Sequence, residues 1–120
     1  MYEHIWNGKE LVQRFTGQVT GDQITESVNA ILGDYRFDEI RSLIGDYSQC
    51  DGFSIQPQLL EEISATLGAA AITNPQITIA IVTERPEIVA AAWAYLASGL
   101  AVYPLRIFPA IFAKFRRYGT

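Results

Sequence analysis

The sequence holds very little of the chemistry on which most catalytic and metal sites depend. It has one histidine, His4, and one cysteine, Cys50, in 120 residues. A single cysteine excludes an internal disulfide bond and favours a reducing compartment, so we expect a cytoplasmic protein. A single histidine, distant in sequence from the other candidate residues, supports neither a catalytic triad nor a histidine-based metal site. The sequence therefore predicts a protein without metal, cofactor or enzymatic activity.

Signals for membrane insertion or export are also lacking. One uncharged stretch, residues 88–105, reaches only the lower limit for a membrane-spanning helix. It is rich in alanine and is interrupted by Ser98, Gly99 and Pro104, so we expect a buried helix followed by a buried strand. The first ten residues show no basic segment followed by an apolar core, and no signal peptide is expected.

Acidic residues are missing from the C-terminal quarter of the chain. All 13 acidic residues precede residue 88, whereas four of the nine basic residues follow it: Arg106, Lys114, Arg116 and Arg117. The net charge is −4 and no basic stripe is visible, which argues against a nucleic-acid partner. The basic end is compatible with an acidic partner, with anionic lipid or with the acidic surface of the protein itself, and we favour the last.

Turn and helix-stop signals divide the chain into regularly alternating elements. Apolar residues make up 49% of the sequence and charged residues 18%, which is typical of a globular protein and, at this length, of a single domain over residues 1–120. Asn7-Gly8 predicts a hairpin, Thr20 or Asp22 a helix start, and Pro57 and Pro86 first helical positions. Helices are predicted over 22–32, 57–73, 86–98 and 109–117, and strands over 4–6, 9–17, 41–47, 76–82 and 102–108.

This order, β-β-α-β-α-β-α-β-α, predicts an α/β fold. Strands that alternate with helices form right-handed crossovers and parallel pairs, and the N-terminal hairpin adds one antiparallel strand. We expect a mixed five-stranded sheet with four helices.

Several short blocks in this order resemble the SpoIIAA-like proteins, relatives of the STAS domains that include bacterial anti-sigma-factor antagonists. The resemblance covers nearly the whole chain and implies a STAS-like fold more firmly than any activity, since the group is mostly uncharacterised. The blocks are Gly17, Asp34-x-Arg36-Phe37-Asp38-x-Ile40-Arg41, Ile44-x-Asp46, Asp51-Gly52-Phe53, Asn74-Pro75-x-Ile77-x-Ile79-Ala80-Ile81-Val82 and Arg106-Ile107-Phe108.

The first candidate site is the stretch after the third strand, residues 46–54, which we expect to be a loop. STAS proteins that act as phospho-switches carry a serine at this position, and Ser48 and Ser54 are its counterparts here. The usual Asp-Ser-Ser/Thr-Gly run is absent, and Asp46 and Asp51 would repel a phosphate. The alternative is that Asp51 and Ser54 satisfy backbone amides in the turn and cap. The predicted interaction loop consists of Asp46, Ser48, Asp51, Gly52, Phe53 and Ser54.

The second candidate site is an apolar face near the C-terminus. The predicted third helix, last strand and last helix contribute to it, and it consists of Trp93, Leu96, Tyr103, Phe108, Phe112 and Phe115. With the nearby cations, such a face fits a lipid-like ligand or a membrane surface. The plainer alternative is that these side chains seal the core at the edge of the sheet.

Together these patterns predict a regulatory or protein-interaction module that contacts a protein partner through residues 46–54. A carrier for an apolar or lipid-like small molecule is the alternative. An enzyme that uses Asp46 is a weaker third hypothesis, and an exposed edge strand makes a homodimer plausible.

Overall fold

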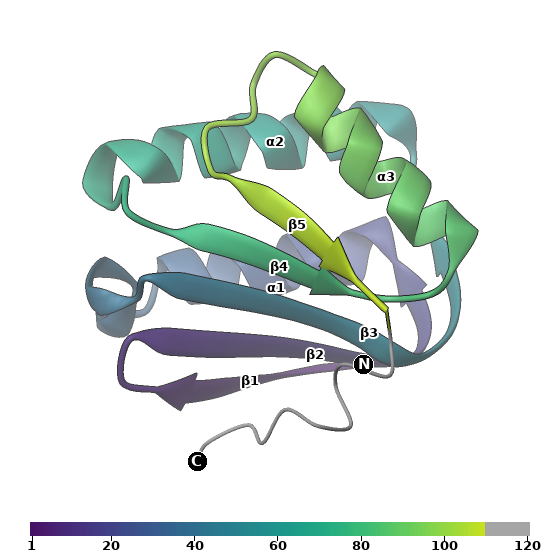
Figure 1. Ribbon diagram of the computed structural model, residues 1–120, viewed down its shortest axis with the longest axis horizontal. Helices are drawn as coiled ribbons and strands as arrows, with labels where there is room; N and C mark the ends of the chain where they lie inside the picture. Colours follow the sequence, from purple (N-terminus) through teal and green to yellow (C-terminus); the bar gives the residue numbers. More distant parts are fainter. Residues whose placement is uncertain (110–120) are drawn as a thin grey trace.

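The protein is a single layer of helices packed on a five-stranded sheet (Figure 1). The computed structural model describes residues 1–109. The strands are β1 (Tyr2–Asn7), β2 (Glu10–Thr20), β3 (Ser42–Ser54), β4 (Thr78–Val82) and β5 (Leu105–Phe108). The helices are α1 (Gly21–Leu32), α2 (Pro57–Thr73), α3 (Pro86–Ala97) and the short 3-10 helix η1 (Tyr35–Glu39). The predicted α/β class, the mixed five-stranded sheet and the element order as far as β5 are confirmed.

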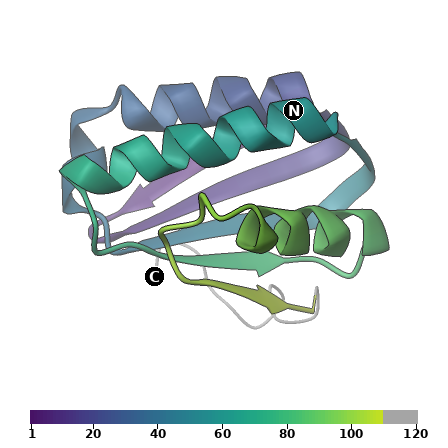
Figure 2. The same cartoon turned by 90° about the horizontal axis from the view of Figure 1, so that it is seen from above.

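The strands lie in the sheet in the same order as in the sequence. β1 and β2 form the predicted antiparallel hairpin, and Gly8, at a φ of 60°, lies in its turn. The pairs β2–β3, β3–β4 and β4–β5 are parallel. Right-handed crossovers that always step toward the next strand place their helices on one face of the sheet. Figure 2 shows α1, α2 and α3 on that single face.

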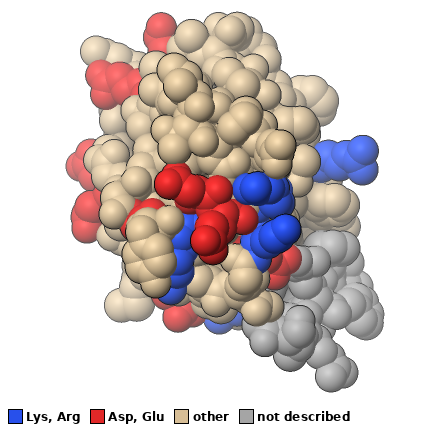
Figure 3. Space-filling model, turned by 90° about the vertical axis from the view of Figure 1, so that its left-hand side faces the viewer, with Lys and Arg blue, Asp and Glu red and all other residues tan. Residues whose placement is uncertain are grey.

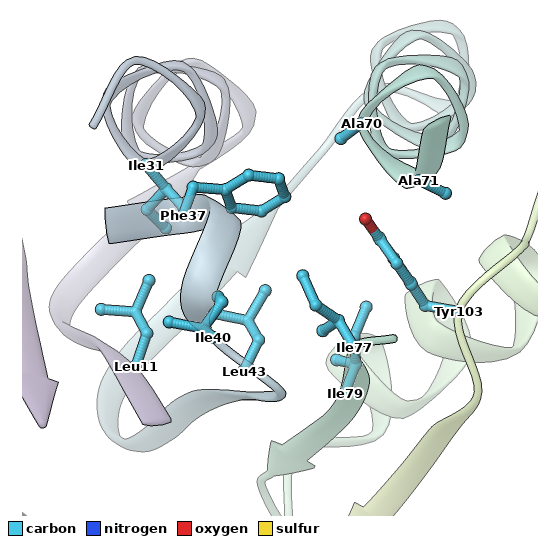
Figure 4. Packing of buried hydrophobic residues seen from close by; sticks show 10 residues of the cluster. All are labelled: Leu11, Ile31, Phe37, Ile40, Leu43, Ala70, Ala71, Ile77, Ile79 and Tyr103. Atoms are coloured by element: carbon cyan, nitrogen blue, oxygen red, sulfur yellow. The ribbon is translucent and has the colours of Figure 1, made fainter. Parts of the chain in front are cut away.

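Two apolar clusters fill the space between this helical layer and the sheet. One is centred on Leu11, Phe37 and Ile77, and Figure 4 shows the Tyr103 hydroxyl pointing from the far side toward the end of α2. That hydroxyl donates a hydrogen bond of 2.7 Å to the Asn74 carbonyl oxygen. The other cluster is centred on Phe15 and Tyr47, whose rings are stacked 4.8 Å apart. Together these clusters pack the helices against the sheet.

The opposite face of the sheet carries a third, smaller cluster. Side chains alternate between the two faces of a strand, so Val12, Ile44 and Val82 point away from the helices. No helix of residues 1–109 lies on this side (Figure 2), which we call the helix-free face.

The prediction of a loop over residues 46–54 is wrong, because these residues form the second half of β3. Twice along β3 an extra residue is inserted relative to β2: between the pairs Arg14↔Asp46 and Thr16↔Gln49, and between Gly17↔Cys50 and Gln18↔Gly52. Such β-bulges favour the polar residues and glycines that also mark loops.

The helix boundaries follow the predicted signals. Thr20 accepts a hydrogen bond from the Gln23 amide at the start of α1, and Pro57 and Pro86 begin α2 and α3. Gly33 follows α1 with a φ of −82°, and not in the left-handed conformation that glycine often adopts there, because the chain continues into η1. The predicted fourth helix, residues 109–117, extends beyond the described residues.

Candidate functional site

An apolar cavity of about 110 Å³ lies between the helices and the sheet. It is partly open to solvent, and all three long helices contribute to its wall: Ile24 and Val28 from α1, Ile63 and Leu67 from α2, and Ile88 and Ala92 from α3. Gly45 of β3 forms part of its floor, where a Cβ atom would lie 2.9 Å from the Ile81 Cδ1 atom. Glycine at this position therefore leaves room that any other residue would reduce.

One residue of the cavity lining, Gln13, links the cavity to a polar network. Among its described lining residues, Gln13 alone carries a side-chain amide. Gln13 donates a hydrogen bond of 2.6 Å to the Ser27 hydroxyl, which also lies 2.6 Å from Nε2 of His4. Burial lowers the pKa of His4, and the negative charge of Asp34 opposes that effect. The neutral imidazole is therefore the form that this network holds at neutral pH.

Among the described residues, His4 and Ser27 form the only serine–histidine pair within hydrogen-bond distance. No sequence motif marks this pair, because 23 residues separate the two. The Ser27 side chain is fully buried. A serine nucleophile must reach its substrate, so this pair is a structural link between β1 and α1.

We expect the stability of the protein to fall as the pH is lowered from about 7.5 to about 5.5. A histidine whose folded pKa lies below its unfolded value of 6.5 contributes stability above that value, and this contribution is lost as the pH falls through the unfolded pKa toward the folded one. Urea unfolding at both pH values should show this loss in the wild type and a smaller loss in His4→Gln. An equal pH dependence in the two proteins would contradict the assignment to His4.

Asp46 and Ser48 of the predicted interaction loop are brought together at the first bulge. Asp46 Oδ1 accepts hydrogen bonds from the Ser48 amide, 2.9 Å away, and from the Ser48 hydroxyl, 2.6 Å away. Its other oxygen lies 3.8 Å from Nε of Arg14, which also pairs with Glu3 at 3.1 Å. Asp46 is 2% exposed, so it stabilises the bulge and is poorly placed to act on a substrate.

The other four predicted loop residues do not form one surface. Asp51 and Ser54 are exposed, whereas Gly52 is buried beneath the Gln18 side chain. Phe53 is half-buried and its ring meets Tyr47 edge-on at 6.0 Å, on the cavity side. The N-terminus of α2 has no side-chain cap, so the expected capping role of Asp51 and Ser54 there is not observed.

A polar hollow of about 430 Å³ lies beside the second half of β3, lined by Tyr47, Ser48, Cys50 and residues 84–87. Arg85 pairs with Glu87 at 2.9 Å, and its Nη1 donates to the Cys50 carbonyl oxygen at 3.5 Å. Burial raises the pKa of the Cys50 thiol, with Arg85 opposing this effect. The raised pKa disfavours the thiolate, which is the reactive form of a cysteine.

The predicted apolar face is also divided by the structure. Trp93 and Leu96 lie on α3, where Trp93 is 61% exposed. Tyr103 is buried in the core and Phe108 packs on the helix-free face, on the other side of the sheet. Phe112 and Phe115 lie outside the described residues. The cavity that does exist is lined by other residues of α3, which sequence periodicity alone does not distinguish from ordinary core positions.

In the block Asp34-x-Arg36-Phe37, the Arg36 side chain links Asp34 to the Trp6 ring of β1. Arg36 donates to both carboxylate oxygens of Asp34, at 2.9 and 2.7 Å, and its guanidinium lies 4.4 Å from the centre of the Trp6 ring. The hydrogen bonds from Arg36 lower the pKa of Asp34 to about 2. On the side of the molecule that carries η1, acidic and basic side chains are intermixed below a broad uncharged area (Figure 3). That face offers no continuous basic stripe to a nucleic acid.

Within residues 1–109, no group of three histidine, cysteine, aspartate or glutamate side chains is placed to hold a metal ion. In the same range, every helix is too short or too polar to cross a membrane.

No protein-family model matches the sequence, and no curated protein matches it. These comparisons assign the chain to no family.

Proposed function

We propose that the protein is a non-catalytic binding domain of STAS-like architecture that holds a small apolar molecule, or the end of an acyl chain, between its helices and its sheet. The observation that carries the proposal is the cavity of about 110 Å³, whose lining is almost entirely aliphatic and aromatic. The STAS-like part of the proposal rests on the resemblance in the sequence, and the mixed five-stranded sheet with alternating helices supports it. The proposal favours the carrier hypothesis over the interaction module.

The size of the cavity limits the ligand. An engineered protein cavity of about 150 Å³ with similar walls stays dry and binds benzene. The present cavity is smaller, so a ligand larger than a benzene ring must leave its remainder outside or displace the helices that line the cavity. A closed void of this size costs about 2–3 kcal/mol of stability at about 24 cal/mol per Å³, which is an upper bound for a cavity that is partly open to solvent. Filling it with apolar atoms is therefore favourable, and a ligand gains part of that energy.

The test is a titration of the full chain with benzene and, separately, with decanoate, followed by the methyl NMR signals of isoleucine. Ile63, Ile81 and Ile88 line the cavity, whereas Ile5 and Ile44 lie on the helix-free face and serve as internal controls. We expect saturable shifts at the first three residues alone. No shift with either probe, or equal shifts on both faces, would overturn the proposal.

A matched pair of variants on α3 tests the location. Ala91 lines the cavity, and its neighbour Ala90 is exposed. Ala91→Leu should fill part of the space and weaken benzene binding at least about tenfold, which corresponds to about 1.4 kcal/mol, without lowering the melting temperature. Ala90→Leu should bind as the wild type does. Equal binding by the two variants would place the ligand elsewhere.

The interaction module remains a second candidate because of one feature of β3. The last residue of β3 that pairs with β4 is Asp46, so within the described chain residues 47–54 have a strand partner on one side only, β2. A strand edge of this kind can pair with an extended segment of a partner. Asp51→Lys is the suitable probe, since Asp51 is exposed, whereas Phe53 contributes to the core. A partner that binds the wild type and Asp51→Lys equally well would not use this edge.

A further inference from the structure

The helix-free face carries three deeply buried side chains at its centre. Val12 is 1% exposed, Ile44 3% and Val82 0%. Their partners on this face include Ile5, Ala80 and Phe108, which are only partly buried. All helices of the described residues lie on the other face (Figure 2). A sheet face with side chains this inaccessible needs a covering layer.

We propose that residues 110–120, the C-terminal segment of the same chain, provide this layer by packing across the helix-free face. The segment reads AIFAKFRRYGT, and it starts two residues after Phe108, whose side chain already lies on this face. Ile111, Phe112 and Phe115 fall at i, i+1 and i+4, which is the spacing of one apolar side of a helix. These side chains match the apolar centre of the face.

The length of the segment fits the distance to be covered. From β5 to β2 there are three strand spacings of about 4.8 Å, or about 14 Å in all. As a helix, residues 110–120 would reach about 16 Å at about 1.5 Å per residue. The segment is therefore long enough to pass over Val82, Ile44 and Val12 without a further linker.

The charges on the helix-free face also favour a path from β5 toward β2. Three acidic residues of this face, Glu3, Glu10 and Asp46, lie on β1, β2 and β3. Arg14 of β2 pairs with Glu3 and Asp46, and β5 carries Arg106. In the segment the apolar residues come first and the cations Lys114, Arg116 and Arg117 come later. A segment that leaves β5 and crosses the sheet brings its cations toward the acidic side of the face, which favours this direction. It also keeps the apolar residues over the central strands.

The experiment measures how well water reaches individual methyl groups of the full-length protein, using a soluble paramagnetic gadolinium chelate. In the wild type we expect the methyl groups of Val12, Ile44 and Val82 to be as protected as that of Ile63 on the helical side. In Phe112→Ser/Phe115→Ser the first three should become several-fold more accessible, while Ile63 stays protected. Ala113→Ser, which lies on the opposite side of a helix from Ile111, Phe112 and Phe115, should resemble the wild type.

Two results would overturn the proposal. One is unchanged protection of Val12, Ile44 and Val82 in a monomeric Phe112→Ser/Phe115→Ser protein. The other is a wild-type protection that decreases on dilution together with the mass measured by light scattering, since a second copy of the chain would then cover the face. Neither result bears on the proposed ligand site, because the apolar cavity lies on the opposite side of the sheet.

Discussion

Phe15→Ala is expected to lower the free energy of unfolding by about 3–5 kcal/mol, the largest effect of any single truncation that we propose. Phe15 is fully buried in the middle of β2, where it stacks on Tyr47 and contacts the ring of Tyr2. Removing the ring leaves a void that β2 and β3 cannot close, because both strands are fixed by their hydrogen bonds. A typical domain is stable by about 5–15 kcal/mol, so this loss amounts to at least about a fifth of the total.

Urea unfolding followed by tryptophan fluorescence measures this loss. Tyr35→Ala is the control, since Tyr35 is 85% exposed and its removal should change the free energy of unfolding by less than about 0.5 kcal/mol. If Phe15→Ala does not fold, Phe15→Leu should fold and lose less than half as much. A loss for Phe15→Ala no greater than that for Tyr35→Ala would refute the central role of Phe15.

The second large effect is expected at Asn74, which joins three parts of the chain. Its side-chain amide donates to the carbonyl oxygens of Phe37 and Ile40, at 2.8 and 2.9 Å, and its backbone carbonyl accepts from Tyr103. Asn74→Ala leaves two buried carbonyl groups without this donor, at about 1–3 kcal/mol each before any water enters. We expect a total loss of about 2–4 kcal/mol.

Asn29→Ala is the matched control for this prediction. Asn29 is exposed on α1, where alanine is the better helix former, so the free energy of unfolding should stay the same or rise slightly. Thermal unfolding of both variants and the wild type provides the comparison. Similar melting temperatures for Asn74→Ala and Asn29→Ala would mean that water replaces the lost amide at little cost.

Local signals in the sequence were enough to predict most elements of the fold. Pro57, Pro86 and the Thr20 cap act within one turn of the chain, and the structure begins its helices at these positions. The extent of β3 could not be predicted in the same way, because β2 holds residues 47–54 in the sheet through pairing across the fold. The Asp46–Ser48 and Asp51-Gly52 patterns are typical of loops and of bulges alike.

The candidate site was less predictable than the fold. The cavity depends on the packing of three helices that are far apart in the sequence, and on the space left by Gly45. Trp93 was predicted to contact a ligand because it is aromatic and lies near other apolar positions in the sequence. In the structure its side chain is exposed on the outer side of α3. Hydrophobic periodicity predicts which side of a helix is apolar. It does not predict where the packing between helices leaves a cavity.

The strand order has a consequence for the folding pathway. Every strand pairs with the next one along the chain, so no step of sheet assembly waits for a segment from the distant end. The entropic cost of closing a loop increases with the number of residues between the two segments that come together. Here little more than one helix lies between the two strands of each parallel pair. The ladder between β2 and β3 is the longest of the three parallel ones. We therefore expect the sheet to form first at β2 and β3 and then to grow outward. The edge strand β5 should join last.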